Sequence, residues 1–356
     1  MGKFKNVLML LLMLLLLAAC GNTSTEAPAT ESEGEGEAGT AGDAGEGGTA
    51  KYAFVFKNTG NPYGEKMYEG FEKAINEAGG EVIYRSPDQP TAEGQIQIIE
   101  QLITQKVSAI AIAGNDNDAL EPVLKKAMEN GIKVLSVDSA VNSNSRMLHV
   151  NQANPERIGR VQIQAIGEMI NYEGQIAILS ATSQATNQNL WIEWMQEELK
   201  DPKYANMELV KVAYGDDLRD KSVSETEALL KSYPDLKGII APTTVGIAAA
   251  GKVLTDKGLA GEVALTGLGL PSEMASYIEN GVSPWMYLWN PIDVGYAAGY
   301  ASVELVNGKT GALGETFEIG ELGSFEVVED GDGTQIMLGD PFKFDSSNIS
   351  EWKDVY

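Results

Sequence analysis

The sequence is poor in the residues that most metal sites and many catalytic sites use. Its 356 residues include one cysteine, Cys20, and one histidine, His149. A disulfide within the chain and a cysteine metal site are excluded, because both need more than one cysteine. A zinc site or histidine acid–base chemistry would have to use His149 alone. We therefore expect no metal, no cofactor and no enzymatic activity, and we expect a structural role for His149.

Basic residues are also scarce. The chain has 26 lysines and arginines against 51 aspartates and glutamates, which gives a formal net charge of -25. Such an acidic surface repels nucleic acid, and we therefore expect no nucleic-acid partner. Solubility of a secreted protein is the simplest explanation of the excess acid. The hydrophobic content of 43% and the charged content of 22% are ordinary for a soluble globular protein.

The amino terminus has the pattern of a secretory signal. Lys3 and Lys5 precede a short apolar run from Val7 to Leu17, and small residues follow up to Cys20. The stretch Leu-Ala-Ala-Cys at 17–20 resembles the lipobox of bacterial lipoproteins, in which the cysteine is diacylated and becomes the first mature residue. We expect residues 1–19 to be a signal peptide and Cys20 to anchor the protein on the extracytoplasmic face of the cell membrane. An uncleaved signal anchor with an incidental cysteine is the alternative.

Residues 21–50, which follow Cys20, contain no aromatic and no basic residue and are rich in Gly, Ala, Thr, Ser and Glu. Such a composition buries too little apolar surface to offset the entropy lost on folding. We expect a disordered acidic tether between the lipid anchor and the folded part.

From Tyr52 onward, short apolar runs alternate with segments of helical spacing. Repeated strand–helix units predict parallel sheets with helices on both faces. Two successive sets of about five units favour an α/β fold of two doubly wound lobes over one very wide sheet. We expect one lobe from 51–153 plus 291–312, the other from 154–290 plus 313–356, and three hinge segments near 151–154, 289–291 and 310–316.

Polar side chains follow the predicted strands at the edge where open parallel sheets bind ligands. Lys57 follows the first strand, Asp118 lies beyond the third, and Asp138 follows the fourth; the strand at 282–289 ends in Trp289, and Asn290 comes next. Carboxylates and amides hydrogen-bond adjacent hydroxyls, and aromatic faces cover C–H surface. This inventory predicts a site for a small hydroxylated molecule, with Asp138, Trp289 and Asn290 among its contacts.

Four motifs give a specific resemblance. They are Thr-Asn-Gln-Asn-Leu-Trp at 186–191, Ala-Pro-Thr-Thr-Val-Gly at 241–246, Thr-Gly-Leu-Gly-Leu-Pro at 266–271 and Leu-Trp-Asn-Pro at 288–291. In this order they resemble the ribose-type (type I periplasmic) solute-binding proteins, and within them the rhamnose-binding and autoinducer-2-binding (LsrB-like) branch. The resemblance covers essentially Tyr52 to the end of the chain.

The resemblance implies a set of ligand contacts. Lys57 and Asp118 match polar contacts from one lobe of the autoinducer-2 receptors, and the matching contacts from the other lobe are Asn187, Gln188, Pro242 and Thr244. Asn187 stands where that pattern has aspartate, and Thr244 stands where it has alanine. Both departures suit a rhamnose-type ligand, although either residue still hydrogen-bonds a hydroxyl of autoinducer-2.

Structural roles are the alternative for several of these residues. Asp118, Asn187 and Gln188 stand at helix starts and are also good caps. Asp138 is alternatively a turn residue and Trp289 a core residue. Asn290 is alternatively part of the hinge.

The resemblance implies a monomer that captures a small sugar-like ligand between its lobes and passes it to the membrane permease of an ABC importer. A receptor that presents autoinducer-2 in quorum sensing is the first alternative. A sugar-processing enzyme is the second. The loop from Lys57 to Gly64 lacks the glycine pattern of dinucleotide enzymes.

Overall fold

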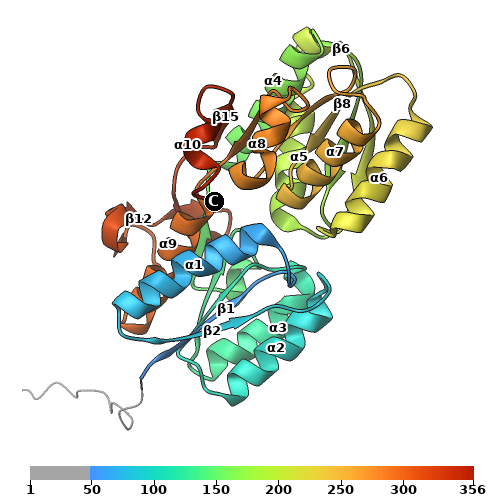
Figure 1. Ribbon diagram of the computed structural model, residues 1–356. Helices are drawn as coiled ribbons and strands as arrows, with labels where there is room; N and C mark the ends of the chain where they lie inside the picture. The colour runs from blue at the N-terminus through green and yellow to red at the C-terminus, as the bar shows by residue number, and fades with distance from the viewer. Residues whose placement is uncertain (1–48) are drawn as a thin grey trace, which may run out of the picture. The chain divides into compact units, whose positions relative to one another are not determined.

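The computed structural model describes residues 49–356, in which the two main sheets are mostly parallel and have helices on both faces (Figure 1). The expected signal peptide, Cys20 and nearly all of the expected tether lie outside the described residues. Among the residues described, no helix is both long enough and apolar enough to cross a membrane.

The first sheet has seven strands in the order β13-β14-β5-β4-β3-β1-β2, all parallel except β13. Four helices cover it: α1, α2, α3 and α9. The bounds are β1 Lys51–Val55, α1 Pro62–Glu77, β2 Glu81–Arg85, α2 Ala92–Thr104, β3 Ala109–Ile112, α3 Asn117–Glu129, β4 Lys133–Val137, β5 Leu148–Asn151, α9 Pro291–Val306, β13 Val328–Asp330 and β14 Gly333–Met337. We call this part the first lobe.

The second sheet has four parallel strands in the order β7-β6-β8-β9. Its elements are α4 Pro155–Met169, β6 Glu173–Ser180, α5 Thr186–Glu198, β7 Asn206–Tyr214, α6 Arg219–Ser232, β8 Leu236–Ala241, α7 Thr244–Asp256, β9 Ala264–Gly267 and α8 Pro271–Glu279. An antiparallel pair, β10 Trp285–Leu288 and β15 Phe342–Asp345, and the short helix α10 Ile349–Trp352 accompany it. We call this part the second lobe.

Both sheets are buried on both faces, which explains the continuous apolar runs of their central strands. In β1, Phe54 packs in one hydrophobic cluster while Ala53 and Val55 pack in another. In β6, Ile176 and Ile178 face one cluster, and Ala177 between them faces the other. Because neighbouring strands run parallel, their carboxyl ends lie at the same edge of each sheet.

Three segments of chain connect the lobes, between β5 and α4, between β10 and α9, and between β14 and β15. The backbone N–H of Asn154 donates to the carbonyl of Gly339 over 2.9 Å, which ties the first segment to the third. The prediction of two doubly wound lobes joined by a three-segment hinge is confirmed.

We expected the third connection near 310–316 and residues 313–356 in the second lobe. Instead, the connection follows β14, and residues 313–337 belong to the first lobe. β14 extends the first sheet beside β5, with Gln335 paired to His149, and Ile336 is fully buried. The hairpin of β11 Thr316–Glu318 and β12 Ser324–Glu326 also contacts the first lobe, through α9. β14 covers the edge of the first sheet that β5 would otherwise expose. The chain therefore stays in the first lobe as far as β14, and the expected boundary was wrong.

Helices α1 and α9 are far apart in the sequence but lie side by side in the first lobe (Figure 1). Their close approach depends on two glycines. A Cβ on Gly295 would lie 1.7 Å from the carbonyl oxygen of Met67, and one on Gly70 would lie 1.9 Å from that of Ile292. Side chains at these positions would have to push the helices apart.

We expect Gly295→Ala to destabilise the protein by about 1–3 kcal/mol, because overpacking forces backbone shifts. Thermal unfolding of the ligand-free protein should show a melting temperature several degrees lower. The control is Glu304→Ala on the same helix, where the side chain is half-buried and about 0.5 kcal/mol or less is expected. Equal melting temperatures for the two variants would contradict the close helix packing.

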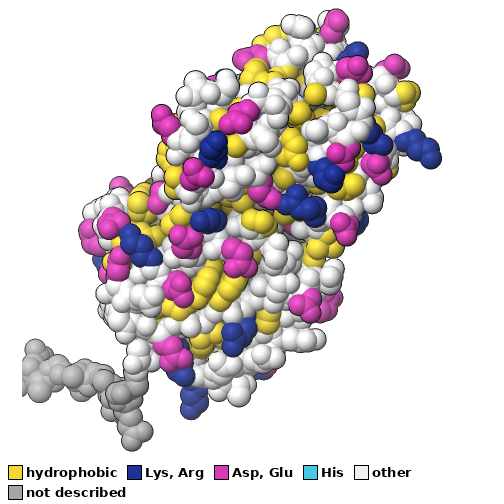
Figure 2. All heavy atoms as spheres, in the orientation of Figure 1, with side chains coloured by type: hydrophobic (Ala, Val, Ile, Leu, Met, Phe, Trp, Pro, Cys, Tyr) yellow, Lys and Arg dark blue, Asp and Glu magenta, His cyan; other side chains and the backbone are white. Residues whose placement is uncertain are grey.

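Charged side chains are mixed over the surface. On the face shown in Figure 2, acidic side chains alternate with basic ones over both lobes. Many of the basic residues are engaged in ion pairs, such as Lys126 with Glu100 and Arg160 with Glu198.

Candidate ligand-binding site

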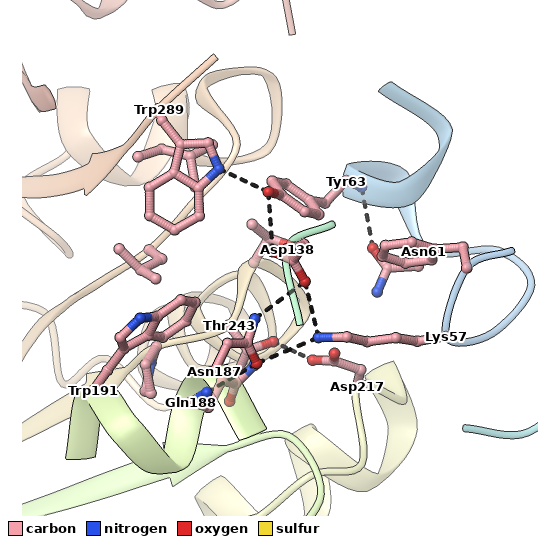
Figure 3. Close-up of a pocket in the computed structure, with 15 residues that line it drawn as sticks. Lys57, Asn61, Tyr63, Asp138, Asn187, Gln188, Trp191, Asp217, Thr243 and Trp289 are labelled. Atoms are coloured by element: carbon pink, nitrogen blue, oxygen red, sulfur yellow. Dashed lines mark hydrogen bonds and ion pairs between the residues drawn. The ribbon is translucent and has the colours of Figure 1, made fainter. Parts of the chain in front are cut away.

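A cavity lies where strand ends of the first lobe meet strand ends of the second (Figure 3). Its lining residues come from both lobes and from the segment before α9: Phe56, Lys57, Asn61, Tyr63, Asp138, Asn187, Gln188, Trp191, Asp217, Pro242, Thr243, Thr244, Leu268, Leu288 and Trp289. The space left between them is about 30 Å³, because several of these side chains contact one another across the cavity. That volume holds roughly two water molecules.

Lys57 enters the cavity directly after β1. Its backbone is held from behind: Asn115 donates its side-chain amide to the Lys57 carbonyl over 2.8 Å, and Gln95 donates to the carbonyl of Phe56 over 3.1 Å. The ammonium lies 3.0 Å from a carboxylate oxygen of Asp138, and both side chains are buried. A buried lysine needs such a counter-charge, since an unpaired charge away from water is costly.

Asp138 follows β4 with a φ of 62°, a left-handed conformation that aspartate tolerates better than most residues. Its carboxylate forms an ion pair with the Lys57 ammonium. It also accepts hydrogen bonds from the Asn187 side-chain amide at 3.1 Å and from the Tyr63 hydroxyl at 3.2 Å. Asp138 is therefore the acceptor at the centre of this network.

Asn187 brings the second lobe into the network from the start of α5. Its Nδ2 donates to Asp138, and its Oδ1 accepts from the Lys57 ammonium at 3.5 Å. An aspartate here would place a second negative charge beside Asp138, so the amide suits this neighbour. The next residue, Gln188, accepts from the Ser180 hydroxyl at 2.7 Å and from the Ala181 amide at 2.8 Å, which fixes α5 against the end of β6.

Asp217 is a buried carboxylate of the cavity that our sequence reasoning missed. It follows β7 with a φ of 53°, and the Thr243 hydroxyl donates to it. Burial raises the pKa of Asp217 above the usual aspartate value, while the Lys57 charge opposes this rise. The signal was available, because Gly215-Asp216-Asp217 directly follows a strand, as the other site segments do.

Aromatic rings form the remaining wall. Trp289 packs edge-on against Trp191, with ring centroids 5.8 Å apart, and against Tyr63 at 6.3 Å. The Trp289 indole N–H donates to the Tyr63 hydroxyl over 2.7 Å, and that hydroxyl donates to Asp138. Burial, followed by the nearby Asp138 charge, raises the pKa of Tyr63 well above its usual value, so the hydroxyl stays protonated as a donor.

Seven of the predicted contacts lie together in this cavity: Lys57, Asp138, Asn187, Gln188, Pro242, Thr244 and Trp289. Two do not line it. Asp118 is exposed on the first turn of α3 and accepts from Asn142 at 3.0 Å, while Asp116 caps the helix. Asn290 caps α9 by accepting from the Ile292 amide at 3.0 Å. Their alternative roles, in a helix start and in the hinge, describe these positions better.

The site combines buried acceptors, donors and aromatic rings from two separate sheets. Within residues 49–356, no group of His, Cys, Asp and Glu side chains is arranged to hold a metal ion. The arrangement suits reversible binding, since carboxylate and amide groups that now pair with one another are able to exchange those bonds for hydroxyls of a guest. Fold and site together define a two-lobed protein that binds a small polar ligand between its lobes.

Comparison with known proteins specifies the family. A family model described as a periplasmic binding protein domain matches residues 52–310, so the chain belongs to the periplasmic binding protein family. Members of this family act outside the cytoplasm.

Solved structures and a curated relative agree with this assignment. An ABC transporter solute-binding protein from Clostridium phytofermentas with bound L-rhamnose is 49% identical, with a TM-score of 0.85 over 87% of this chain and 100% of that one. LsrB from Clostridium saccharobutylicum in complex with AI-2 shares the fold, with 23% identity, a TM-score of 0.81 and coverage of 85% of this chain and 99% of that one. A D-ribose/D-allose-binding protein of Pseudomonas aeruginosa is 25% identical over 225 residues, which are 61% of this chain and 70% of the relative.

Proposed function

We propose that the protein binds L-rhamnose in the cavity between its lobes and delivers it to the permease of an ABC importer. The observation that carries this proposal is the buried network of Lys57, Asp138 and Asn187, which joins both lobes through groups that hydrogen-bond hydroxyls. A ligand that contacts both lobes at once favours the closed arrangement over an open one. Binding without catalysis fits a family of solute-binding proteins.

The apolar part of the lining supports a deoxysugar. Trp191, Trp289, Leu268 and Leu288 contribute side chains to the same cavity as the polar network. Rhamnose carries a methyl group in place of a hydroxymethyl group, and this methyl group needs an apolar surface when it leaves water. The 49% identity to a protein solved with L-rhamnose supports the same ligand.

Isothermal titration calorimetry with purified protein tests the proposal. We expect L-rhamnose to bind at least about 10-fold more tightly than D-ribose and D-xylose, because a ligand that leaves a buried polar group unpaired loses about 1–3 kcal/mol. The sugar should be recovered chemically unchanged after release. Tighter binding of D-ribose, or conversion of L-rhamnose, would contradict the proposal.

Autoinducer-2 is the alternative ligand, in a receptor that serves quorum sensing. Lys57, Gln188 and Pro242 match the receptor pattern and support this ligand. Asn187 and Thr244 depart from the pattern and argue against it. Competition by autoinducer-2 against bound L-rhamnose distinguishes the two, and displacement at equal or lower concentrations would favour the receptor role.

We propose further that Cys20 carries the lipid anchor and that the protein acts as a monomer. The lipobox-like stretch at 17–20 supports the anchor, and two acyl chains give stable attachment to a membrane. Labelling of growing cells with palmitate should mark the wild-type protein and leave Cys20→Ala unlabelled. Label on both proteins would place the lipid elsewhere.

A further inference from the structure

A second cavity adjoins the candidate site. Its volume is about 140 Å³, compared with about 30 Å³ for the first. Asp138, Asn187 and Trp191 line both cavities, so the same three side chains border both spaces. A substituent on a sugar held in the first cavity therefore has adjacent space to occupy.

One buried polar group that lines the second cavity has unused hydrogen-bonding capacity. Gln152 is 2% exposed, and its side-chain carbonyl has no hydrogen-bond partner among residues 49–356. Asn151 uses its side-chain N–H to donate to Gln335 over 2.8 Å. A buried carbonyl without a donor destabilises the protein, and a hydroxyl of a ligand in this cavity would supply that donor.

His149 adds a neutral polar group to the same lining. Burial, followed by the nearby charge of Arg146, lowers the pKa of His149 to about 3, so the imidazole is uncharged at neutral pH. One ring nitrogen, Nδ1, lies 2.9 Å from the Ser136 hydroxyl. Ala140, Leu190 and the Trp191 ring provide apolar surface beside these groups. Amide side chains and the Trp191 ring line both cavities, and the imidazole of His149 is present in the second alone.

We propose that the second cavity is a subsite for a further sugar unit, so that the preferred ligand is a disaccharide containing rhamnose. This inference rests on the proposed function, because it requires a rhamnose unit in the first cavity. Asp138, Asn187 and Trp191 lie between the two units and contact both. Gln152 and His149 hydrogen-bond the added unit.

Calorimetry with a set of disaccharides tests the subsite. In each member of the set, L-rhamnose carries a second L-rhamnose on a different hydroxyl, and L-rhamnose alone serves as the reference. We expect at least one disaccharide to bind about 10-fold more tightly than L-rhamnose, since the added atoms contribute binding energy of their own.

Two variants place the added unit. Gln152→Leu removes the unpaired carbonyl, and Ala140→Leu fills part of the second cavity; neither residue lines the first. Both should reduce the advantage of the disaccharide to about threefold or less, while the affinity for L-rhamnose stays within about twofold and shows that the variants are folded.

The outcomes separate this inference from the proposed function. If L-rhamnose binds and no disaccharide does, the subsite is refuted and the proposed function stands. A disaccharide advantage that survives both variants would also refute the subsite. If neither kind of sugar binds, both proposals fail.

Discussion

Asp138→Asn is expected to weaken L-rhamnose binding about 100-fold or more, because hydrogen bonds to an ionised group contribute about 1.5–3 kcal/mol each. The carboxylate of Asp138 receives the Lys57 ammonium, the Asn187 amide and the Tyr63 hydroxyl, and it is 4% exposed. Asparagine keeps the size of the side chain but loses the charge and one acceptor oxygen. The Lys57 ammonium would also lose its closest counter-charge. Calorimetric titration of L-rhamnose gives the affinity directly.

The matched control is Asp118→Asn, which makes the same chemical change on the same lobe. Asp118 is exposed at the start of α3 and does not line the cavity. Its substitution should change the affinity for L-rhamnose by about twofold or less, in line with small effects at exposed positions. Wild-type affinity in Asp138→Asn, or a large loss in Asp118→Asn, would contradict the placement of the site.

Asp217→Asn is expected to change binding and stability in opposite directions. The carboxylate is buried, and its raised pKa means that the folded protein holds a proton there more tightly than the unfolded chain does. Above that pKa the ionised, buried group reduces the stability of the folded state. Asparagine removes this cost, so the melting temperature of the ligand-free protein at pH 7 should rise, while L-rhamnose affinity should fall about 10-fold or more.

The same carboxylate gives the affinity a pH dependence. Because its pKa is raised, Asp217 takes up its proton at a less acidic pH than an exposed aspartate does. Affinity that needs the ionised group is complete above this pKa and is lost as the pH falls through it. Asp217→Asn should remove this part of the acid-induced loss. A titration with the same pH profile in wild type and variant would show that Asp217 does not contact the ligand.

The strand ends made much of the cavity predictable from the sequence. Lys57 and Asp138 are predictable because each follows a short, mostly apolar and buried strand, and such strands end at the ligand-binding edge of a parallel sheet. The rule also applies to Asp217, but the strand before it, β7, is only partly buried and therefore has a weaker apolar pattern. The sequence pattern therefore gives a weaker indication that Asp217 lies at the ligand-binding edge.

Two predicted contacts that do not line the cavity, Asp118 and Asn290, stand at or next to helix starts. Asp116 and Asp118 stand two positions apart at the same strand end, and composition does not say which of them caps α3. The structure gives the cap to Asp116, so that the helix begins before Asp118 and carries it away from the cavity. Asn290 caps α9 in the same way. A polar residue at a helix start satisfies backbone N–H groups or a ligand, and only packing decides between them.

The end of the chain was the least predictable part of the fold. After α9 the strands are short, and β11, β12, β13 and β14 are separated by no α-helix, only by one short 3-10 turn at Gly320–Leu322. The alternation of strands and helices that identified both sheets is therefore lost. What places β14 is its pairing with β5, a contact between residues more than 180 positions apart, as between Asn151 and Gln335. Local pattern carries no information about such a partner.

A crystal structure of the protein with bound L-rhamnose would show whether the sugar lies between the lobes. We expect one sugar in the first cavity, with hydroxyls bonded to Lys57 or Asp138 from one lobe and to Asn187 or Asp217 from the other. A sugar that contacts side chains of one lobe alone, or that lies outside this cavity, would contradict this expectation.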